Sequence, residues 1–255
     1  MKISIVIITY NEDDRVEQTL KSCSEIADEI VVVDSFSTDK TIDILKKYKV
    51  KIFQKKFIDY GSQKNFAMGK AKNEWILNLD ADERVSKELK ENILKLKQKY
   101  KIGTDGFLIN RKTFYMDKWI KHSGWYPDRK LRLFRKSKSR WQGRIHERLI
   151  LNGKIQKING DILHFTYRNI TDHIKRINRY SKMQAQDIVK KKTKLLYLRF
   201  LLLPPITFIR FYFWKLGILD GFPGIVIAVV SSWGTAMKYM KAIEIKKEKK
   251  NLINI

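Results

Sequence analysis

The sequence predicts an α/β fold built on a mostly parallel sheet, and two observations carry this prediction. Short runs of Ile, Val and Leu alternate with amphipathic stretches through the first hundred residues, which is the order of strands and helices in a parallel sheet. The runs are continuously apolar, as strands covered on both faces should be. With 255 residues, the chain can form one such core and a smaller appended module.

The expected elements follow from local patterns. Strands are expected where large apolar residues run together, and helices where apolar residues recur three or four positions apart. Ser86 precedes one helical stretch and is suited to cap it. The expected strands cover residues 3–9, 30–33, 50–53, 75–79, 106–111, 130–134 and 161–166, and the expected helices cover about 16–23, 39–48, 62–72, 86–100 and 171–191.

The charge balance is strongly basic, with a formal net charge of +26. Such an excess indicates an anionic partner, which could be nucleic acid, an acidic membrane or a phosphorylated substrate. The lysine-rich composition of the whole chain is the simpler explanation for part of it. Cys23 is the only cysteine, which excludes an intrachain disulfide and fits a reducing compartment. The first apolar run is too short for a secretory signal.

Polar residues directly follow three of the expected strands. These are Thr9-Tyr10-Asn11-Glu12, Asp34-Ser35 and Asp80-Ala81-Asp82. Because ligands of open parallel sheets bind beyond the carboxyl ends of the strands, the three groups should converge on one crevice. Two aspartates one residue apart suit Mg²⁺ or Mn²⁺, which take oxygen ligands and share them with substrate phosphates. Two purely structural roles are the alternatives: Asp34 could brace a turn without contacting a ligand, and Asn11 could cap the next helix without contacting a ligand.

Basic residues follow in the same part of the chain. Lys64 begins a helix after a glycine, where it could reach a phosphate group, because helix starts favour anions. Arg129, Arg132 and Arg135 are interspersed with leucines, which predicts that the arginines share one face of a strand. That face would meet either phosphate groups or solvent.

Several motifs resemble those of family 2 glycosyltransferases with the GT-A fold. They are SIVIITYNE at residues 4–12, IVVVDSFSTDKT at 30–41 and LDADE at 79–83. The later motifs YPDRKLRLFR at 126–135 and WQGRIHE at 141–147 are similar to the branch that contains bacterial lipopolysaccharide core glucosyltransferases. The resemblance covers roughly residues 1–190, and it is more specific for the family than for the sugar.

The resemblance implies an inverting transfer from a nucleotide diphosphate sugar. Asp80 and Asp82 would hold the metal and face the diphosphate, and His164 would be a third metal ligand unless it is only a structural residue of its strand. Inversion requires a carboxylate that takes the proton from the acceptor hydroxyl. The implied substrate-binding residues are Thr9, Tyr10, Asn11, Glu12, Asp34, Ser35, Lys64, Asp80, Ala81, Arg129, Arg132 and His146.

Two carboxylates are candidates for the catalytic base. Glu147 is the first choice, because it lies beyond the donor-binding half, where the acceptor should sit, and His146 could orient it. The alternative for Glu147 is an ion pair with Arg144 or Arg148. Asp128 is the second choice, but the basic residues around it favour an ion-pair role.

The C-terminal region is apolar and flanked by lysines. Residues 195–214 and 216–237 are hydrophobic enough to contact lipid, but Pro204-Pro205 and Gly217–Gly224 should interrupt them. A membrane span needs about 20 apolar residues, so we expect helices that lie in the membrane interface, or a re-entrant hairpin. A dimerising or core helical pair, and two true spans, are the alternatives.

The sequence therefore predicts three segments: a nucleotide-sugar-binding half (1–105), an acceptor and catalytic half (106–192) and a membrane-associating helical tail (193–255). We expect a transfer from UDP-glucose to a membrane-borne glycolipid such as the lipopolysaccharide core, at the cytoplasmic face of the inner membrane. Transfer to a polyprenyl phosphate is one alternative. A basic nucleic-acid-binding protein is another, although no nucleic-acid-binding motif is present.

Overall fold

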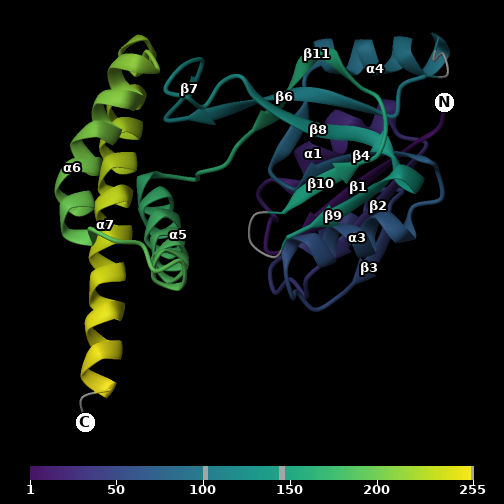
Figure 1. Ribbon diagram of the computed structural model, residues 1–255. Helices are drawn as coiled ribbons and strands as arrows, with labels where there is room; N and C mark the ends of the chain where they lie inside the picture. The colour runs from purple at the N-terminus through teal and green to yellow at the C-terminus, as the bar shows by residue number, and fades with distance from the viewer. Residues whose placement is uncertain (100–102, 144–146, 254–255) are drawn as a thin grey trace. The chain divides into compact units, whose positions relative to one another are not determined.

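The computed structural model describes residues 1–99, 103–143 and 147–253, and it separates into two units (Figure 1). Unit 1 comprises Met1–Lys112 and Asp128–His164, and unit 2 comprises Thr113–Pro127 and Phe165–Ile255. The donor, acceptor and tail segments predicted above are functional divisions, and they stay predictions.

Unit 1 contains the predicted α/β sheet. Strands and helices alternate through its first part, in the positions that the apolar pattern predicted. Its elements are β1 (Ile3–Thr9), α1 (Val16–Cys23), η1 (Ser24–Ile26), β2 (Glu29–Asp34), α2 (Thr41–Lys46), β3 (Lys51–Gln54), α3 (Tyr60–Lys70), β4 (Trp75–Asp80), β5 (Glu83–Val85), α4 (Lys87–Lys99), β6 (Gly106–Tyr115, which runs into unit 2), β8 (Asp128–Arg135), η2 (Lys136–Lys138), β9 (Ser139–Gln142), β10 (Arg148–Leu151) and β11 (Ile155–His164).

The strands lie in the order β3-β2-β1-β4-β8-β6-β11-β5, and β9 and β10 form a separate pair. β1 runs parallel to β2 and β4, and β2 runs parallel to β3. β8 is antiparallel to β4 and to β6. The first four strands therefore make the parallel part of the sheet, as predicted, and the later strands extend it with antiparallel pairing.

Helices cover both faces of this sheet, because successive side chains of a strand point to opposite faces. Ile3, Ile5 and Ile7 of β1 belong to one buried cluster, which also contains residues of α1 and α4. Val6 belongs to a second cluster, with Ala67 of α3 among its members. Burial on both faces explains why these strands read as continuous apolar runs. Ser86 caps α4 as predicted, because its Oγ accepts a hydrogen bond from the Leu89 amide at 3.2 Å.

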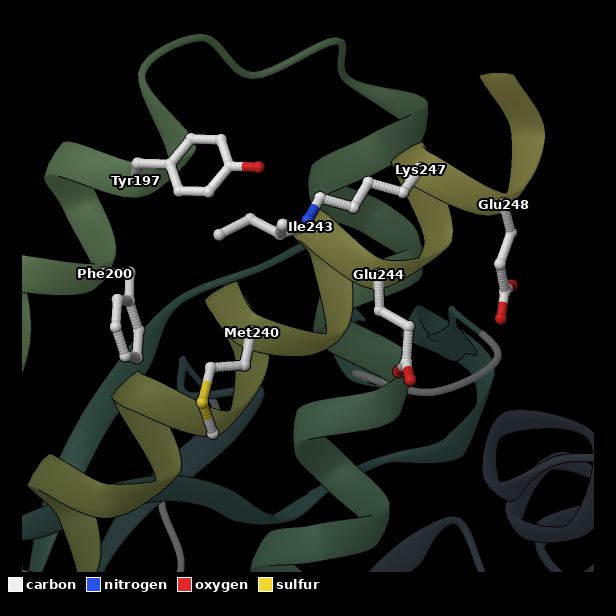
Figure 2. Close-up of a pocket in the computed structure, with 7 residues that line it drawn as sticks. All are labelled: Tyr197, Phe200, Met240, Ile243, Glu244, Lys247 and Glu248. Atoms are coloured by element: carbon white, nitrogen blue, oxygen red, sulfur yellow. The ribbon is translucent and has the colours of Figure 1, made fainter. Parts of the chain in front are cut away.

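Unit 2 is mostly helical. Its elements are β7 (Lys118–Trp119), which pairs with the end of β6, α5 (Ile170–Lys190), α6 (Leu196–Ile209), the π-helical turn η3 (Arg210–Trp214), η4 (Gly217–Asp220) and α7 (Phe222–Ile253). α6 and α7 run side by side as a hairpin, and α5 packs against α7 (Figure 1). A pocket of about 440 Å³ lies between the start of α6 and the end of α7, where Tyr197 and Phe200 are grouped with Met240 and Ile243 (Figure 2).

The expected interruption at Pro204-Pro205 is wrong, because α6 continues through both prolines. α7 also contacts this part of α6, where the Ser232 hydroxyl donates to the carbonyl of Pro204 at 2.8 Å. The chain instead breaks after η3, where Leu216 and Gly221 adopt positive φ angles. The interruption predicted around Gly217–Gly224 is therefore confirmed.

Candidate active site

The carboxyl ends of β1, β2 and β4 meet at one edge of the sheet. Thr9 pairs with Asp34, and Ile8 pairs with Asp80, so the three polar groups lie side by side. This confirms the predicted convergence. It follows from the parallel register alone, because parallel strands in register bring the residues that follow them to the same edge.

Asn11 joins the loops that follow β1 and β2. The side-chain oxygen of Asn11 accepts a hydrogen bond from the main-chain amide of Thr38 at 2.8 Å. The main-chain amide of Asn11 donates a hydrogen bond to the Ser37 hydroxyl at 2.9 Å. The φ angle of Asn11 is 54°, a left-handed conformation that asparagine tolerates better than most residues. Asn11 does not cap α1, whose N-cap residue is Arg15. Asn11 instead ties the loop after β1 to the loop after β2.

Asp34 is fully buried and braces its own turn. Its Oδ2 accepts from the Ser37 amide at 2.9 Å, and its Oδ1 accepts from the Ser37 hydroxyl. The turn-bracing role left open by the sequence is therefore present, and a contact with a nucleotide stays a prediction. Ser35 accepts from Gln63 Nε2 at 3.1 Å. Thr9 Oγ1 is buried and has no hydrogen-bond partner among the described residues.

Asp80 lies between two buried cations. Lys64 Nζ is 3.2 Å from its Oδ1, and Arg132 Nη2 is 3.0 Å from its Oδ2. Burial alone would raise the pKa of the Asp80 carboxyl, but the charges of Lys64 and Arg132 outweigh burial and hold the pKa well below its usual range. Asp80 is therefore ionised at neutral pH.

Arg132 is held in place by two residues that the sequence analysis did not single out. It donates to Asn78 Oδ1 at 2.9 Å and to Glu83 Oε1 at 2.7 Å. Glu83 is fully buried, and its Oε2 accepts from the Asp80 amide at 2.9 Å. Asn78 had a signal in the sequence, because it is a polar residue inside a buried apolar strand. Such residues need a hydrogen-bond partner.

The three arginines near β8 do not share one face. Arg132 is buried in the site, Arg129 is exposed, and Arg135 lies 3.6 Å from Asp105 Oδ1. The pairing of β8 with β6 shifts between Leu131 and Leu133, which leaves Arg132 as an extra residue. A β-bulge of this kind redirects a side chain. Residues three apart also lie on opposite faces of a regular strand, so the prediction that the three arginines share one face was wrong.

Glu147 meets Lys64 from the other side. Lys64 Nζ lies 3.0 Å from Glu147 Oε1 and 4.7 Å from the ring centroid of Trp141. Lys64 is only 3% exposed, and it pairs with two carboxylates. These are Asp80, which the sequence analysis predicted to face the diphosphate, and Glu147, which it predicted to be the catalytic base. The expected alternative, an ion pair of Glu147 with a neighbouring arginine, was thus right about pairing, but the cation shown is Lys64. His146 and Arg144 lie outside the described residues.

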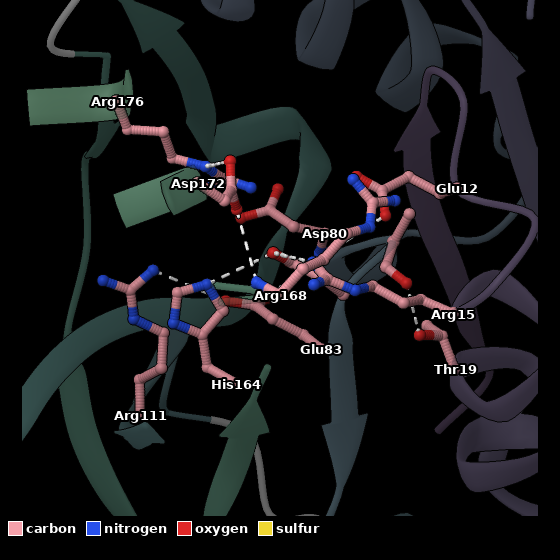
Figure 3. A network of polar contacts seen from close by, with 12 residues as sticks. Glu12, Arg15, Thr19, Asp80, Glu83, Arg111, His164, Arg168, Asp172 and Arg176 are labelled. Carbon is pink, nitrogen blue, oxygen red and sulfur yellow. Dashed lines mark hydrogen bonds and ion pairs between the residues drawn. The ribbon is translucent and has the colours of Figure 1, made fainter. Parts of the chain in front are cut away.

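Asp82 faces His164 and Arg15. His164 Nε2 is 3.5 Å from Asp82 Oδ2, and Arg15 Nη1 is 3.7 Å from the same oxygen. Figure 3 draws Arg15 and His164 among the polar contacts of this region. β11 brings His164 there by pairing with β5, where His164 lies opposite Glu83. Among the described residues, no group of three or more His, Cys, Asp or Glu is arranged to hold a metal. Asp82 and His164 nevertheless suit an ion that completes its coordination with substrate phosphates.

Asp128, the second candidate base, is occupied by cations. Arg111 Nη2 lies 2.7 Å from Asp128 Oδ2, and Lys130 Nζ lies 3.1 Å from Oδ1. Burial tends to raise the pKa of Asp128, but Arg111 and Lys130 lower it overall. A carboxylate held by two cations is a poor proton acceptor, so this geometry argues against Asp128 as the base.

Comparison with known proteins agrees with the motifs. The model of glycosyl transferase family 2 matches residues 4–152. The chain is 30% identical over 265 residues to an uncharacterized glycosyltransferase of Rickettsia typhi, covering 99% of this chain and 90% of the relative. It is 29% identical over 253 residues to the lipopolysaccharide core biosynthesis glycosyltransferase LpsC of Rhizobium meliloti, covering 93% and 92% of the two chains.

Among solved structures, TarS 1-349 of S. aureus in complex with UDP is 18% identical, with a TM-score of 0.45, covering 98% of this chain and 92% of that one. The family match spans more than half of the chain and includes the ends of β1, β2 and β4. The chain therefore belongs to glycosyl transferase family 2, and its α/β sheet is parallel through β1, β2, β3 and β4, as the resemblance implied.

Proposed function

We propose that the chain transfers a sugar, with glucose favoured, from a UDP-sugar to a membrane-borne glycolipid such as the lipopolysaccharide core, with inversion at the anomeric carbon. The carrying observation is the position of Lys64, 3.2 Å from Asp80 and 3.0 Å from Glu147. Lys64 links Asp80, the carboxylate that would face the donor diphosphate, to the candidate base. The LpsC relative supports the choice of acceptor.

The strand ends would hold the donor. Asp34 and Thr9 lie side by side at the ends of β2 and β1, where the nucleoside would bind. Thr9 Oγ1 is buried without a partner among the described residues, which leaves one hydrogen-bonding group unsatisfied. Asp80, Asp82 and His164 would hold the divalent ion, Mg²⁺ or Mn²⁺. That ion would neutralise charge on the departing diphosphate.

Arg132 and Lys64 would act on the donor by charge. Arg132 is fixed by Asn78, Glu83 and Asp80, so its position does not need to change when a ligand binds. Lys64 is held by two carboxylates on different elements. An entering diphosphate would compete with these carboxylates for the Lys64 ammonium. Preorganised charge of this kind supplies much of the catalysis in group transfer.

Glu147 would take the proton from the acceptor hydroxyl. As the hydroxyl oxygen attacks the anomeric carbon, the bond to the diphosphate breaks on the opposite face and the configuration inverts. Movement of Lys64 toward the diphosphate would free Glu147 for this role. Donor binding would then prepare the base at the moment when the acceptor can react.

The apolar tail supports a location at a membrane. α6 with η3, Leu196–Trp214, is a 19-residue segment long and apolar enough to cross a membrane by length and composition, and 6% of its most apolar window is buried. A membrane-borne acceptor would be reached from a protein that sits on the bilayer. We propose that this is the cytoplasmic face of the inner membrane, where nucleotide sugars are made.

A donor panel tests the proposal. UDP-, GDP- and ADP-sugars are added with Mg²⁺ or Mn²⁺, and thermal shift and slow donor hydrolysis are recorded. We expect the largest effects with UDP-glucose. Stabilisation by nucleic acid and by none of the sugars would contradict the proposal. An acid-labile sugar phosphate as product would show a polyprenyl phosphate acceptor instead.

A further inference from the structure

The α6–α7 hairpin exposes an unusually apolar surface. We define the hairpin face as the exposed apolar side chains of α6, of residues 210–221 and of α7 up to Trp233. On α6 its members recur three or four positions apart, as residues on one side of a helix do. At the turn, Trp214 is 72% exposed and Phe222 is 68% exposed. Proteins that remain in water rarely expose so many large apolar groups together.

The opposite side of the hairpin is covered by its own unit. Ile227 of α7 is fully buried in a cluster with Tyr115 and Ile120. Farther along α7, Ala242 is fully buried in a cluster with Ala185 of α5. The covering segments therefore reach from the turn to the far end of the hairpin. Within the described part of unit 2, the side of the hairpin opposite these clusters stays exposed.

The turn itself is tied to a polar loop by Asp220. This carboxylate is 2% exposed, and it accepts hydrogen bonds from the amides of Lys121 and His122 at 3.0 and 3.1 Å and from the Ser123 hydroxyl at 2.7 Å. Lys118 Nζ donates to the main-chain oxygen of Asp220 at 3.0 Å. Four hydrogen bonds thus attach residues 118–123 to the turn. The turn cannot enter a hydrocarbon phase without carrying these polar groups with it.

The charge pattern indicates which surface would cover the hairpin face. Residues 195–241 contain five Lys or Arg and a single acidic residue, Asp220, whose carboxylate is buried in the hydrogen bonds described above. Arg199, Arg210 and Lys215 are exposed beside the apolar residues. An apolar surface bordered only by positive charge is complementary to anionic phospholipids. It is less suited to a second copy of the same basic face, because like charges would meet.

We propose that the hairpin face lies flat in one leaflet of an anionic bilayer, at the boundary between headgroups and acyl chains, and does not cross it. A crossing would carry Lys215 and the loop of residues 118–123 through the hydrocarbon core. Docking in the plane leaves both with the headgroups and buries only the apolar side. The inference rests on the proposed function only in that the acceptor is membrane-borne.

Vesicle binding tests the docking surface. Full-length protein is sedimented with vesicles of phosphatidylcholine alone or with phosphatidylglycerol, and no sugar is present. We expect binding to the anionic vesicles, and a loss of at least about tenfold in the double variant Trp214→Ser, Phe222→Ser, because two aromatic side chains are removed from the bilayer. Ile58→Ser is the matched control, since Ile58 is 66% exposed outside the hairpin. Equal binding by all three proteins would overturn the proposal.

Depth measurements separate docking from crossing. Spin labels are attached to cysteines replacing Leu202, Ile218 and Val229, all exposed on the hairpin face. Burial raises the pKa of the native Cys23 thiol to about 12, so it stays unlabelled. We expect all three labels at similar depths, roughly 5–10 Å below the headgroups. A label at residue 202 near the bilayer centre, with residue 218 at the opposite surface, would show a span and overturn the proposal.

A dimer that loses its stability in the double variant, without vesicle binding by the wild type, would also overturn the proposal. It would show that a second copy covers the face. These outcomes are distinct from a failure of the proposed function. A protein that binds vesicles but transfers no sugar refutes the transfer and leaves the docking intact.

Discussion

Replacing Lys64 with methionine should disrupt the candidate site and destabilise the fold. Lys64 is 3% exposed and contacts Asp80, Glu147 and the Trp141 ring. Breaking a buried ion pair costs roughly 3–5 kcal/mol. Asp80 keeps Arg132 as a partner, and the Glu147 side chain is 20% exposed, so we expect a smaller loss of about 2 kcal/mol.

That loss corresponds to a fall in Tm of about 4–8 °C for a chain of this size. Lys90→Met is the matched control, because Lys90 pairs with Glu25 at 2.7 Å on the surface. We expect it to change stability by less than about 0.5 kcal/mol. Thermal denaturation followed by circular dichroism gives both values.

Activity provides the second measurement on Lys64. Removal of one preorganised charge at a transferring group typically lowers the rate by about 10²-fold. We expect this loss in kcat/KM for the donor, and partial recovery in Lys64→Arg, which restores the charge. A Lys64→Met protein with wild-type Tm and with kcat/KM within about threefold of wild type would refute the role of Lys64.

Three further predictions concern single residues. Asp82→Ala should abolish metal-dependent turnover and leave the fold intact; full activity at the same metal concentration would exclude Asp82 as a ligand. Glu147→Gln should bind the donor as the wild type does, measured by calorimetry, and transfer poorly; a wild-type rate would place the base elsewhere. Burial lowers the pKa of His173 from 6.5 to about 4. Between these two pH values the unfolded chain therefore binds a proton at His173 that the native chain does not bind. The free energy of unfolding should consequently fall as the pH drops through this range. His173→Phe should show a smaller difference in Tm between pH 7 and pH 5; an unchanged difference would assign the effect to other groups.

The parallel part of the sheet could be predicted because local pattern determines it. Burial on both faces gives each strand a continuous apolar run, and the right-handed crossover of successive β-α-β units leaves few arrangements for the strands. The convergence of Thr9, Asp34 and Asp80 then follows from the register. No side-chain contact had to be known for this part of the site.

The contacts of Lys64 could not be predicted in the same way. Its bond to Glu147 joins residues 83 positions apart in the sequence, and no local pattern specifies it. The position of Arg132 depends on a β-bulge, which strict alternation does not reveal. In the sequence, Asp220 was interpreted as one of the residues that interrupt a helix. In the structure, its carboxylate binds a loop that lies about 100 positions earlier in the sequence. These three interactions depend on tertiary packing.

The configuration of the new glycosidic bond tests the central claim most directly. Wild-type protein is incubated with UDP-glucose, Mn²⁺ and a lipopolysaccharide core acceptor, and the product is examined by proton NMR. Because UDP-glucose carries an α bond, the account predicts a β-linked glucosyl product, with almost none from Glu147→Gln. An α-linked product, or equal product from Glu147→Gln, would contradict it.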